Sequence, residues 1–315
     1  MISVIIPIYN ETENIPTLYA HLTEVMATLD RPWELIFIND GSIDGSKQTL
    51  NKLADQDARV KIIHFKRNFG QTAAMMAGID FARGDILISM DGDLQNDPAD
   101  ISQFLVKLEE GYDVCSGWRR ERQDPALRRT LPSRIANFII SRISGVYLHD
   151  YGCSLKAYKK EVIKGVKLYG EMHRFIPIYA SWQGARVTEI PVTHHPRVHG
   201  TSNYGLERTF KVILDLIVVK FLAQYAQKPI YVFGCVGLVN IFIAFLAASA
   251  SLYYKFFGGK SFISTPLPLL FVFTSITGIM CILMGLLAEI VIRTYYQSQD
   301  KPVYLIAESR NLEAE

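Results

Sequence analysis

Short apolar runs alternate with amphipathic stretches along the first two-thirds of the chain. The runs are rich in Val, Ile and Phe and are short enough for single strands, whereas the stretches between them carry apolar residues at helical spacing. Strands that alternate with helices are typical of an α/β domain with a mainly parallel sheet. The predicted strands are residues 3–8, 34–38, 60–65, 85–90 and 112–116.

Two longer stretches without a formal charge follow, at residues 229–254 and 266–288. As a helix, each is long enough to cross a hydrocarbon layer of roughly 30 Å. The short loop 255–265 between them places both outer flanks on one side of the membrane. Because basic residues gather in these flanks, we expect the flanks to lie in the cytoplasm. The basic residues of the flanks are Arg208, Lys211, Lys220, Lys228, Arg293 and Lys301.

Residues 206–228 combine an apolar stripe with basic residues directly before the first uncharged stretch. This pattern predicts one or two helices along the membrane interface, although an ordinary core-facing helix carries the same stripe and stays open as an alternative. The predicted organisation is a globular domain at 1–205, interfacial helices at 206–228, a two-helix transmembrane anchor at 229–293 and a cytoplasmic tail at 294–315.

Charge and cysteine content narrow the partners and the compartment. The chain has 33 basic and 31 acidic residues, a net charge of +2, so no global field favours nucleic acid. The four cysteines include no C-x-x-C pair, which fits neither a zinc site nor a disulfide framework and favours a reducing compartment. The first residues lack the basic region of a secretory signal, so we expect the globular domain in the cytoplasm.

Polar residues cluster where the predicted strands end, which is where ligands bind in parallel sheets. The run DGDLQ at 91–95 directly follows the fourth strand. The carboxylates of Asp91 and Asp93, with the amide oxygen of Gln95, are suitable ligands for Mg²⁺ or Mn²⁺. Acidic residues also cap helices, and a helix begins near Pro98, so capping stays open as a second interpretation.

A second polar cluster, NDGSIDGS at 39–46, follows the second predicted strand. Asp40 is placed to accept a hydrogen bond from a ligand base, whereas Ser42 or Asp44 could simply cap the next helix. No G-x-G-x-x-G or G-x-x-x-x-G-K-[ST] run occurs, so neither a dinucleotide site nor a P-loop is supported.

Taken in order, these runs resemble the motif blocks of family-2 glycosyltransferases, whose fold is GT-A, Rossmann-like with a mainly parallel sheet. Within that family the chain is similar to the polyisoprenyl-phosphate glycosyltransferases, namely the dolichol-phosphate mannose synthases and the bacterial bactoprenol glucosyltransferases with two transmembrane helices. The blocks are SVIIPIYNE at 3–11, NDGS at 39–42, RNFG at 67–70, ARGD at 82–85 and DGDLQ at 91–95.

The resemblance implies roles for the residues that match these blocks. The metal ligands are expected at Asp91, Asp93 and Gln95, and Asp93 is also expected to be catalytic. The residues expected to hold the base and ribose of the sugar nucleotide are Pro7, Tyr9, Glu11, Asp40 and Asp91.

Six arginines and two acidic residues lie between positions 117 and 134, and this basic excess indicates where the second substrate, the acceptor of the sugar, could bind. Guanidinium groups bind phosphate oxygens well, and an apolar-striped segment that could lie against lipid follows, although a solvated basic loop is the alternative. The resemblance implies that Arg119, Arg129, Ser133 and Arg197 contact the acceptor phosphate. It also implies that Asp150 lies near the reaction centre, where a simple turn aspartate is the alternative.

A lipid phosphate simplifies the chemistry, because its second pKa of roughly 6 makes it largely dianionic at pH 7 without a strong general base. We therefore expect inverting transfer of a hexose, glucose from UDP-glucose, to undecaprenyl phosphate at the cytoplasmic face of a bacterial inner membrane. Another donor sugar, such as mannose or aminoarabinose, and a non-catalytic membrane scaffold or flippase partner are the alternatives. The resemblance further implies a homotetramer.

Overall fold

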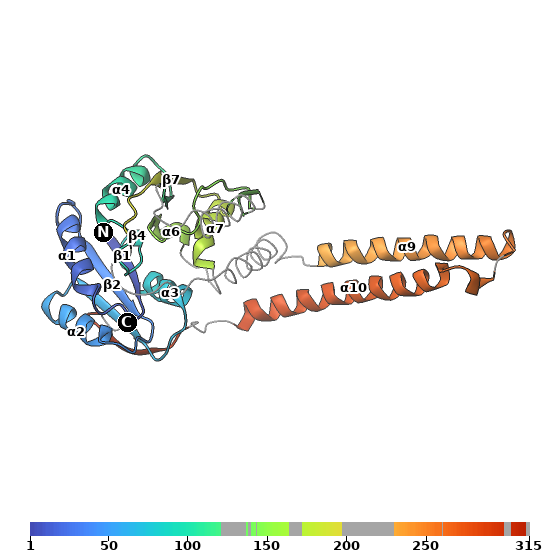
Figure 1. Ribbon diagram of the computed structural model, residues 1–315, viewed down its shortest axis with the longest axis horizontal. Coiled ribbons are helices and arrows are strands. Elements are labelled where there is room, and N and C mark those ends of the chain that lie inside the picture. Colours follow the sequence, from blue (N-terminus) through green and yellow to red (C-terminus); the bar gives the residue numbers. More distant parts are fainter. Residues whose placement is uncertain are drawn as a thin grey trace. The chain divides into compact units, whose positions relative to one another are not determined.

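The computed structural model describes residues 1–120, 137, 140–142, 144–163, 172–196, 230–259, 261–298 and 304–312 of the chain (Figure 1). The chain divides into two compact units, which are described separately. The first comprises Met1–Ile217 together with Pro302–Glu315, and the second comprises Val218–Lys301.

One eight-stranded sheet, in the order β7-β5-β6-β4-β1-β2-β3-β8, runs through the described part of the first unit. Neighbours β4, β1, β2 and β3 are parallel, whereas β6 pairs antiparallel with both β4 and β5, and β8 pairs antiparallel with β3. The mainly parallel GT-A sheet is therefore confirmed. The strands are β1 (Ile2–Ile8), β2 (Trp33–Asn39), β3 (Val60–Phe65), β4 (Ile86–Ser89), β5 (Val114–Trp118), β6 (Lys156–Lys159), β7 (Val187–Pro191) and β8 (Ile306–Arg310).

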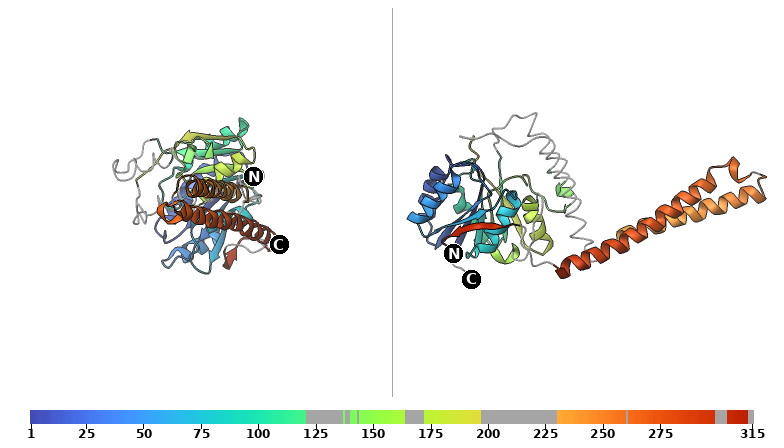
Figure 2. Two further views of the ribbon diagram at one scale, coloured as in Figure 1. Left: turned by 90° about the vertical axis from the view of Figure 1, so that its right-hand side faces the viewer. Right: turned by 90° about the horizontal axis from the view of Figure 1, so that it is seen from below.

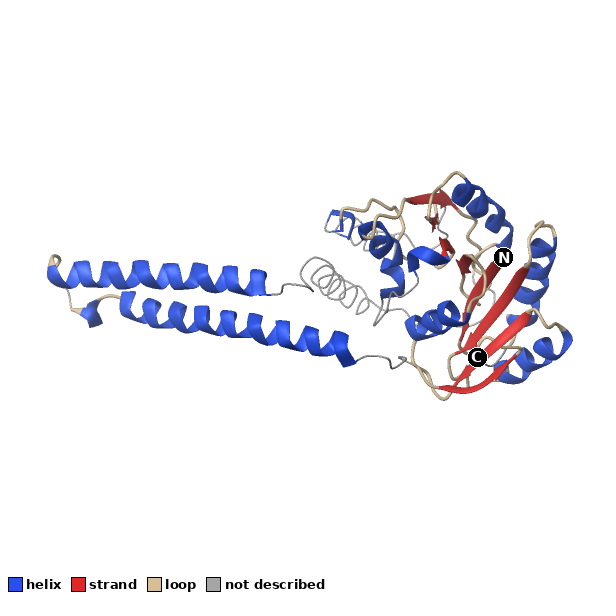
Figure 3. Ribbon diagram, turned by 180° about the vertical axis from the view of Figure 1, so that it is seen from behind, coloured by secondary structure: helices blue, strands red, loops and turns tan. Residues whose placement is uncertain are grey.

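Helices cover both faces of the sheet (Figure 3). Along β1, Val4 and Ile6 join the core under the helices α1, α2 and α4, while Ile5 points to the opposite face, against α3. A Cβ atom on Gly78 of α3 would lie 2.2 Å from Ile5, so a glycine lets this helix approach the sheet closely. The helices of this unit are α1 (Ile15–Ala27), α2 (Ser46–Gln56), α3 (Gln71–Phe81), α4 (Ile101–Glu109), α6 (Lys160–Ile163) and α7 (Ile176–Trp182), with 3₁₀ turns at η1 (Pro98–Asp100) and η3 (Met172–Phe175).

Part of the predicted cytoplasmic tail at 294–315 belongs to the sheet of the first unit. Residues 306–310 form β8, which pairs with β3 and extends the sheet at its edge (Figure 2). The short, half-exposed β8 has too little apolar alternation to be recognised as a strand from the sequence. It forms a strand because pairing with β3 supplies its backbone hydrogen bonds.

The second unit contains two long apolar helices, α9 (Ile230–Phe256) and α10 (Leu267–Ser298), joined through η4 (Phe262–Ser264). Both are long and apolar enough to cross a membrane, over Phe233–Phe256 and Leu267–Ala288. The helices pack where a Cβ atom on Gly237 would lie 2.8 Å from the Gly278 carbonyl oxygen. Glycine at both positions allows the two backbones to touch. The predicted interfacial helices at 206–228 lie outside the described residues.

Candidate active site

The acidic loop after β4 contains a strained backbone turn. Leu94, between Asp93 and Gln95, has φ +62°, a left-handed conformation that leucine rarely adopts. The Asp93 carboxylate accepts a 3.2 Å hydrogen bond from the backbone amide of Gln95, and the Gln71 side chain donates a 2.7 Å hydrogen bond to Asp91. The loop is thus held from within and from the first turn of α3.

Helix capping falls to a different acid. The Asp97 side chain accepts a 2.9 Å hydrogen bond from the Ala99 amide at the start of η1, immediately before α4. The alternative that Asp91 or Asp93 caps this helix is therefore wrong, since Asp97 already does so. Asp91 and Asp93 are left as a pair of acids at the end of a central strand.

Burial and a like charge act together on this pair. Burial, followed by the negative charge of Asp93, raises the pKa of Asp91 to about 6. A hydrogen bond with Ser154 and the positive charges of Arg119 and Arg174 act in the opposite direction. The carboxylate of Asp91 therefore lies within electrostatic reach of two arginines from distant parts of the chain.

The acid pair fits a hard divalent cation. Two carboxylates that repel one another bind a cation favourably, and the side-chain amide of Gln95 offers a neutral oxygen in the same loop. Across the described residues, no group of three or more His, Cys, Asp or Glu side chains is arranged to hold a metal ion. A cation here would therefore take its remaining oxygens from Gln95 and from a bound ligand.

Asp40 joins two loops on the donor side. Its buried carboxylate accepts hydrogen bonds of 2.7 Å from the Phe69 amide and 2.9 Å from the Gly70 amide. Burial raises the pKa of Asp40 despite these two hydrogen bonds and the positive charge of Arg67. Asp40 thus holds loop 66–70, a structural contact that the sequence did not indicate.

The remaining donor-side predictions lie around the end of β1. Tyr9 is 42% exposed, and Pro7 is a partly buried residue of β1. The Glu11 carboxylate accepts a hydrogen bond from Asn14, and the Glu11 amide donates one of 3.1 Å to Ser46. These three residues and Asp40 come from neighbouring strand ends, as the parallel topology requires.

Asp44 has a structural role at the start of α2, although the N-cap residue of this helix is Gly45 and neither Ser42 nor Asp44. Its carboxylate accepts hydrogen bonds of 2.9 Å from the Ser46 amide and 3.1 Å from the Thr12 amide. It therefore ties the turn before α2 to the turn before α1.

Arg119 and Asp150 form a bidentate ion pair. The guanidinium of Arg119, just after β5, donates hydrogen bonds of 2.7 and 3.0 Å to the two carboxylate oxygens of Asp150. Asp150 is also bonded by the Gly152 amide at 3.0 Å, so the turn-aspartate alternative is correct in part. The charge of Asp150 raises the pKa of Arg119 well above its usual range, against the effect of burial.

Two cations near this pair, Lys156 and Arg174, were not predicted from the sequence. Lys156 is 3% exposed, and its ammonium donates hydrogen bonds of 3.2 Å to the Tyr151 carbonyl and 3.5 Å to the Arg174 carbonyl. Burial lowers the pKa of Lys156 to about 8. The strand β6 reads KAYK, with a lysine at each end, so the sequence carries no local signal that one of them is buried at the site.

The other expected acceptor residues, Arg129, Ser133 and Arg197, lie outside the described residues. Their contact with an acceptor phosphate stays a prediction.

The protein-family model described as glycosyl transferase family 2 matches residues 3–166, slightly more than half of the chain. The chain belongs to glycosyltransferase family 2. The family resemblance drawn from the strand-end motifs is thereby confirmed.

Curated relatives match this glycosyltransferase over almost its whole length. The dodecaprenyl-phosphate galacturonate synthase of Rhizobium johnstonii is 42% identical over 309 residues, 97% of this chain and 91% of the relative. The undecaprenyl-phosphate 4-deoxy-4-formamido-L-arabinose transferase of Pseudomonas aeruginosa is 35% identical over 308 residues, 97% of this chain and 89% of the relative. Both names specify a polyprenyl phosphate and a sugar.

Solved structures agree with the fold of the glycosyltransferase. Glucosyl-3-phosphoglycerate synthase from Mycobacterium tuberculosis, crystallised with Mn²⁺, UDP and glucosyl-3-phosphoglycerate, matches with a TM-score of 0.53 at 14% identity. The match covers 71% of this chain and 79% of that chain. At this identity the likeness concerns the fold alone.

Proposed function

We propose that this glycosyltransferase transfers a sugar from a nucleoside diphosphate to a polyprenyl phosphate. The observation that carries the proposal is the place of Asp91 and Arg119 at one edge of the sheet. Ser89 of β4 and Ser116 of β5 both pair with Lys156 of β6, so the residues that follow these two strands lie near one another. Acids there suit a cation-bound diphosphate, and a guanidinium suits a phosphate monoester. The polyprenyl phosphates in the names of both relatives support the same acceptor.

A donor sugar other than glucose is the better supported alternative. The relatives are named for galacturonate and for 4-deoxy-4-formamido-L-arabinose, and neither name contains glucose. The higher identity, 42%, is to the galacturonate synthase. We therefore place a UDP-linked uronic acid first among the donors and a UDP-linked amino or formamido pentose second.

The mechanism we propose is one in-line displacement with inversion. A phosphate oxygen of the lipid attacks the anomeric carbon, and the bond from that carbon to the diphosphate oxygen breaks. Because the acceptor is already dianionic, the chain needs no strong general base. Arg119 would bind the acceptor phosphate while Asp150 holds its guanidinium in place. Asp150 is then a positioning residue and not a base.

Asp91, Asp93 and Gln95 would hold a divalent cation, which neutralises charge on the leaving diphosphate. The mutual repulsion of the two carboxylates and the neutral oxygen of Gln95 in the same loop support this assignment.

We further propose that α9 and α10 anchor the enzyme in the inner membrane with the catalytic unit in the cytoplasm. The chain before α9 and the chain after α10 contribute strands to the same sheet, so both ends of the hairpin must lie on one side of a membrane. The basic flanks favour the cytoplasmic side. The homotetramer expected from the family resemblance stays a prediction, which light scattering in detergent would check.

The test is a donor screen with purified full-length protein in detergent. UDP release would be measured with UDP-galacturonate, UDP-galactose, UDP-glucose and a UDP-linked formamido pentose, each with and without undecaprenyl phosphate and Mg²⁺ or Mn²⁺. We expect lipid-dependent release with the uronic acid donor and little with UDP-galactose, which differs only at the carboxylate. Equal UDP release with and without undecaprenyl phosphate would refute the proposed lipid acceptor. No turnover with any donor would favour the non-catalytic scaffold.

A further inference from the structure

Residues 304–312, near the C-terminal end of the sequence, pair with the edge of the sheet in the first unit and contact a loop on the proposed donor side. β8 pairs antiparallel with the edge strand β3, and the Lys66 amide donates a 3.0 Å hydrogen bond to the Leu305 carbonyl just before β8. Lys66 is the first residue of loop 66–70, the loop that Asp40 holds. The C-terminal segment therefore reaches the start of this loop.

Tyr304 is the buried contact of this segment. Its side chain is 6% exposed, and its ring is stacked on Phe65 with centroids 5.2 Å apart and planes inclined by 14°. Its hydroxyl donates a 2.8 Å hydrogen bond to Asp80 of α3. Tyr304 thus joins the end of β3 to the helix that begins after loop 66–70.

The contact continues from Phe65 into the loop itself. The rings of Phe65 and Phe69 meet edge to face, with centroids 5.6 Å apart and an angle of 85°. The guanidinium of Arg67 lies 4.2 Å from the centre of the Phe69 ring. Because the Phe69 amide donates to Asp40, the chain of contacts from Tyr304 ends at a predicted donor-binding residue.

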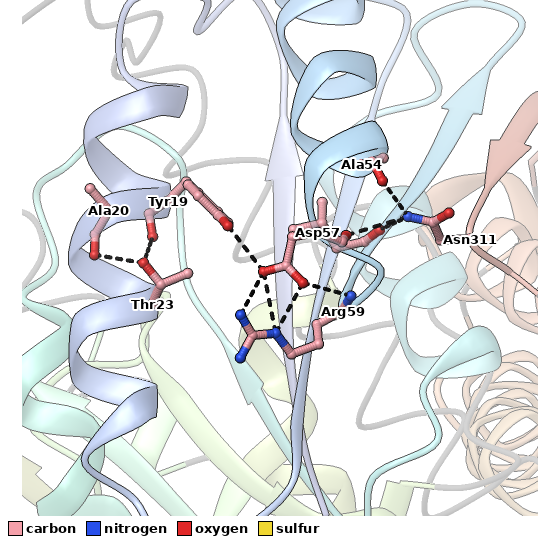
Figure 4. A network of polar contacts seen from close by, with 8 residues as sticks. Tyr19, Ala20, Thr23, Ala54, Asp57, Arg59 and Asn311 are labelled. Atoms are coloured by element: carbon pink, nitrogen blue, oxygen red, sulfur yellow. Dashed lines mark hydrogen bonds and ion pairs between the residues drawn. The ribbon is translucent and has the colours of Figure 1, made fainter.

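The far end of β8 is held independently. The Asn311 side chain donates hydrogen bonds of 2.8 Å to the Ala54 carbonyl and 2.9 Å to the Val60 carbonyl, and Figure 4 shows it bridging toward Asp57 as well. A salt bridge between Lys47 and Glu308 adds an exposed contact. A change at Tyr304 would therefore leave most of the pairing of β8 in place.

We propose that Tyr304 is a positioning residue for nucleotide binding, which acts through Phe65 and Phe69 on the loop that Asp40 holds. The inference rests on the proposed function in one respect, because it takes the Asp40 region as the nucleotide site. Tyr304, far from the donor loops in the sequence, thereby supports loop 66–70 through two aromatic contacts.

The test compares Tyr304→Ala with its neighbour Leu305→Ala in the full-length protein. Leu305 is 56% exposed, so its truncation removes little packing and leaves its carbonyl in place. Titration calorimetry with UDP and Mn²⁺, without lipid, would measure nucleotide affinity directly. We expect Tyr304→Ala to weaken UDP binding about tenfold, the scale of a lost aromatic contact, with Leu305→Ala unchanged.

Kinetics separate positioning from general loss of structure. Tyr304→Ala should raise KM for the sugar nucleotide while KM for the lipid phosphate stays the same, and Tyr304→Phe, which keeps the stacked ring, should restore most of the affinity. If Tyr304→Ala does not fold, Phe69→Leu, which retains apolar volume but removes the edge-to-face contact, should show the same selective loss.

The two possible failures are distinguishable. Equal UDP affinity in Tyr304→Ala and the unsubstituted protein would overturn this inference and leave sugar transfer to lipid untouched. Conversely, if Tyr304→Ala lowers UDP affinity but the unsubstituted protein transfers sugar to no lipid phosphate, the proposed function alone is refuted.

Discussion

The carboxylate of Asp150 holds the guanidinium of Arg119 through two hydrogen bonds, at 2.7 and 3.0 Å, across 31 positions of sequence. Asp150 is 2% exposed and the Arg119 side chain is 19% exposed. An arginine side chain that is free to move loses rotamer freedom when it binds a phosphate. Here the ion pair has already ordered it, which lowers the entropic cost of capturing the phosphate.

Asp150→Asn should therefore impair the acceptor side selectively. The substitution leaves a largely buried guanidinium without its counter-charge, which costs on the order of 3 kcal/mol of folding stability. We expect KM for the lipid phosphate to rise about tenfold or more, with the nucleotide affinity unchanged. Asp113→Asn is the control, because Asp113 pairs with Lys159 at the other end of β5. An effect of Asp150→Asn on donor KM alone would contradict the assignment.

Asp93→Ala and Asp97→Ala form a second matched pair. Asp97 caps the helical segment that begins at η1, so its loss should lower stability by about 1 kcal/mol and leave turnover near normal. Asp93→Ala should abolish turnover while the thermal midpoint stays within a few degrees. Steady-state rates and thermal melts in detergent would measure both. Full activity in Asp93→Ala would remove the cation site from the mechanism.

Gly41→Ala should disturb the donor loops through the backbone. Gly41 has φ +69°, and a Cβ atom there would lie 2.5 Å from backbone atoms of Arg67 and Asn68. Strain and displacement together should cost about 1–3 kcal/mol of stability and weaken UDP binding. Gly45→Ala is the control, since its Cβ would meet only the Thr12 side chain, at 3.1 Å. Unchanged UDP affinity in Gly41→Ala would show that these loops do not contribute to nucleotide binding.

His64 should make the fold sensitive to acid. Its imidazole lies between the Asn39 and Asn51 side chains, each at 3.0 Å, and burial lowers the pKa of His64 to about 4. Between about pH 4 and pH 6.5 the unfolded chain binds a proton that the folded chain does not, so stability falls as the pH falls through this window.

At pH 4, His64 lowers the free energy of unfolding by on the order of 3 kcal/mol relative to neutral pH. His64→Gln should lose this part of the acid sensitivity, which thermal midpoints at pH 4.5 and pH 7 would show. Asp91 titrates in the same window with the opposite sign, so the difference between the two proteins is the informative quantity. Parallel pH curves would mean that His64 is not held neutral.

Hydrophobic patterning predicted the strands β1 to β5, and β1, β2 and β3 are almost entirely buried. It missed β6, β7 and β8, which add to a sheet that already exists. Two of these three pair antiparallel with their neighbours, and lysines bound β6 at both ends. Their strand character comes from the partner strand and not from their own sequence.

The candidate site likewise contains residues that could be predicted from the sequence and residues that could not. Asp91 and Asp93 could be found from sequence, since parallel topology puts strand-end acids at one edge of the sheet. Lys156 and Arg174 could not, because their closeness to Asp150 depends on how segments far apart in the chain fold together. The contact of Tyr304 with Phe65 spans most of the chain, so it too had no local signal.

Gly278→Ala should weaken the apolar hairpin. A Cβ atom on Gly278 would lie 2.8 Å from the Gly237 carbonyl oxygen and equally close to Ile241, so α9 and α10 would have to separate. Overpacking of this kind costs about 1–3 kcal/mol. Ile279→Val is the control, because Ile279 is 54% exposed on the outer side of α10. Unfolding in dodecyl sulfate titrations should come at lower detergent fraction for Gly278→Ala only, and coincident curves for the two variants would show that the glycine contact does not hold the helices together.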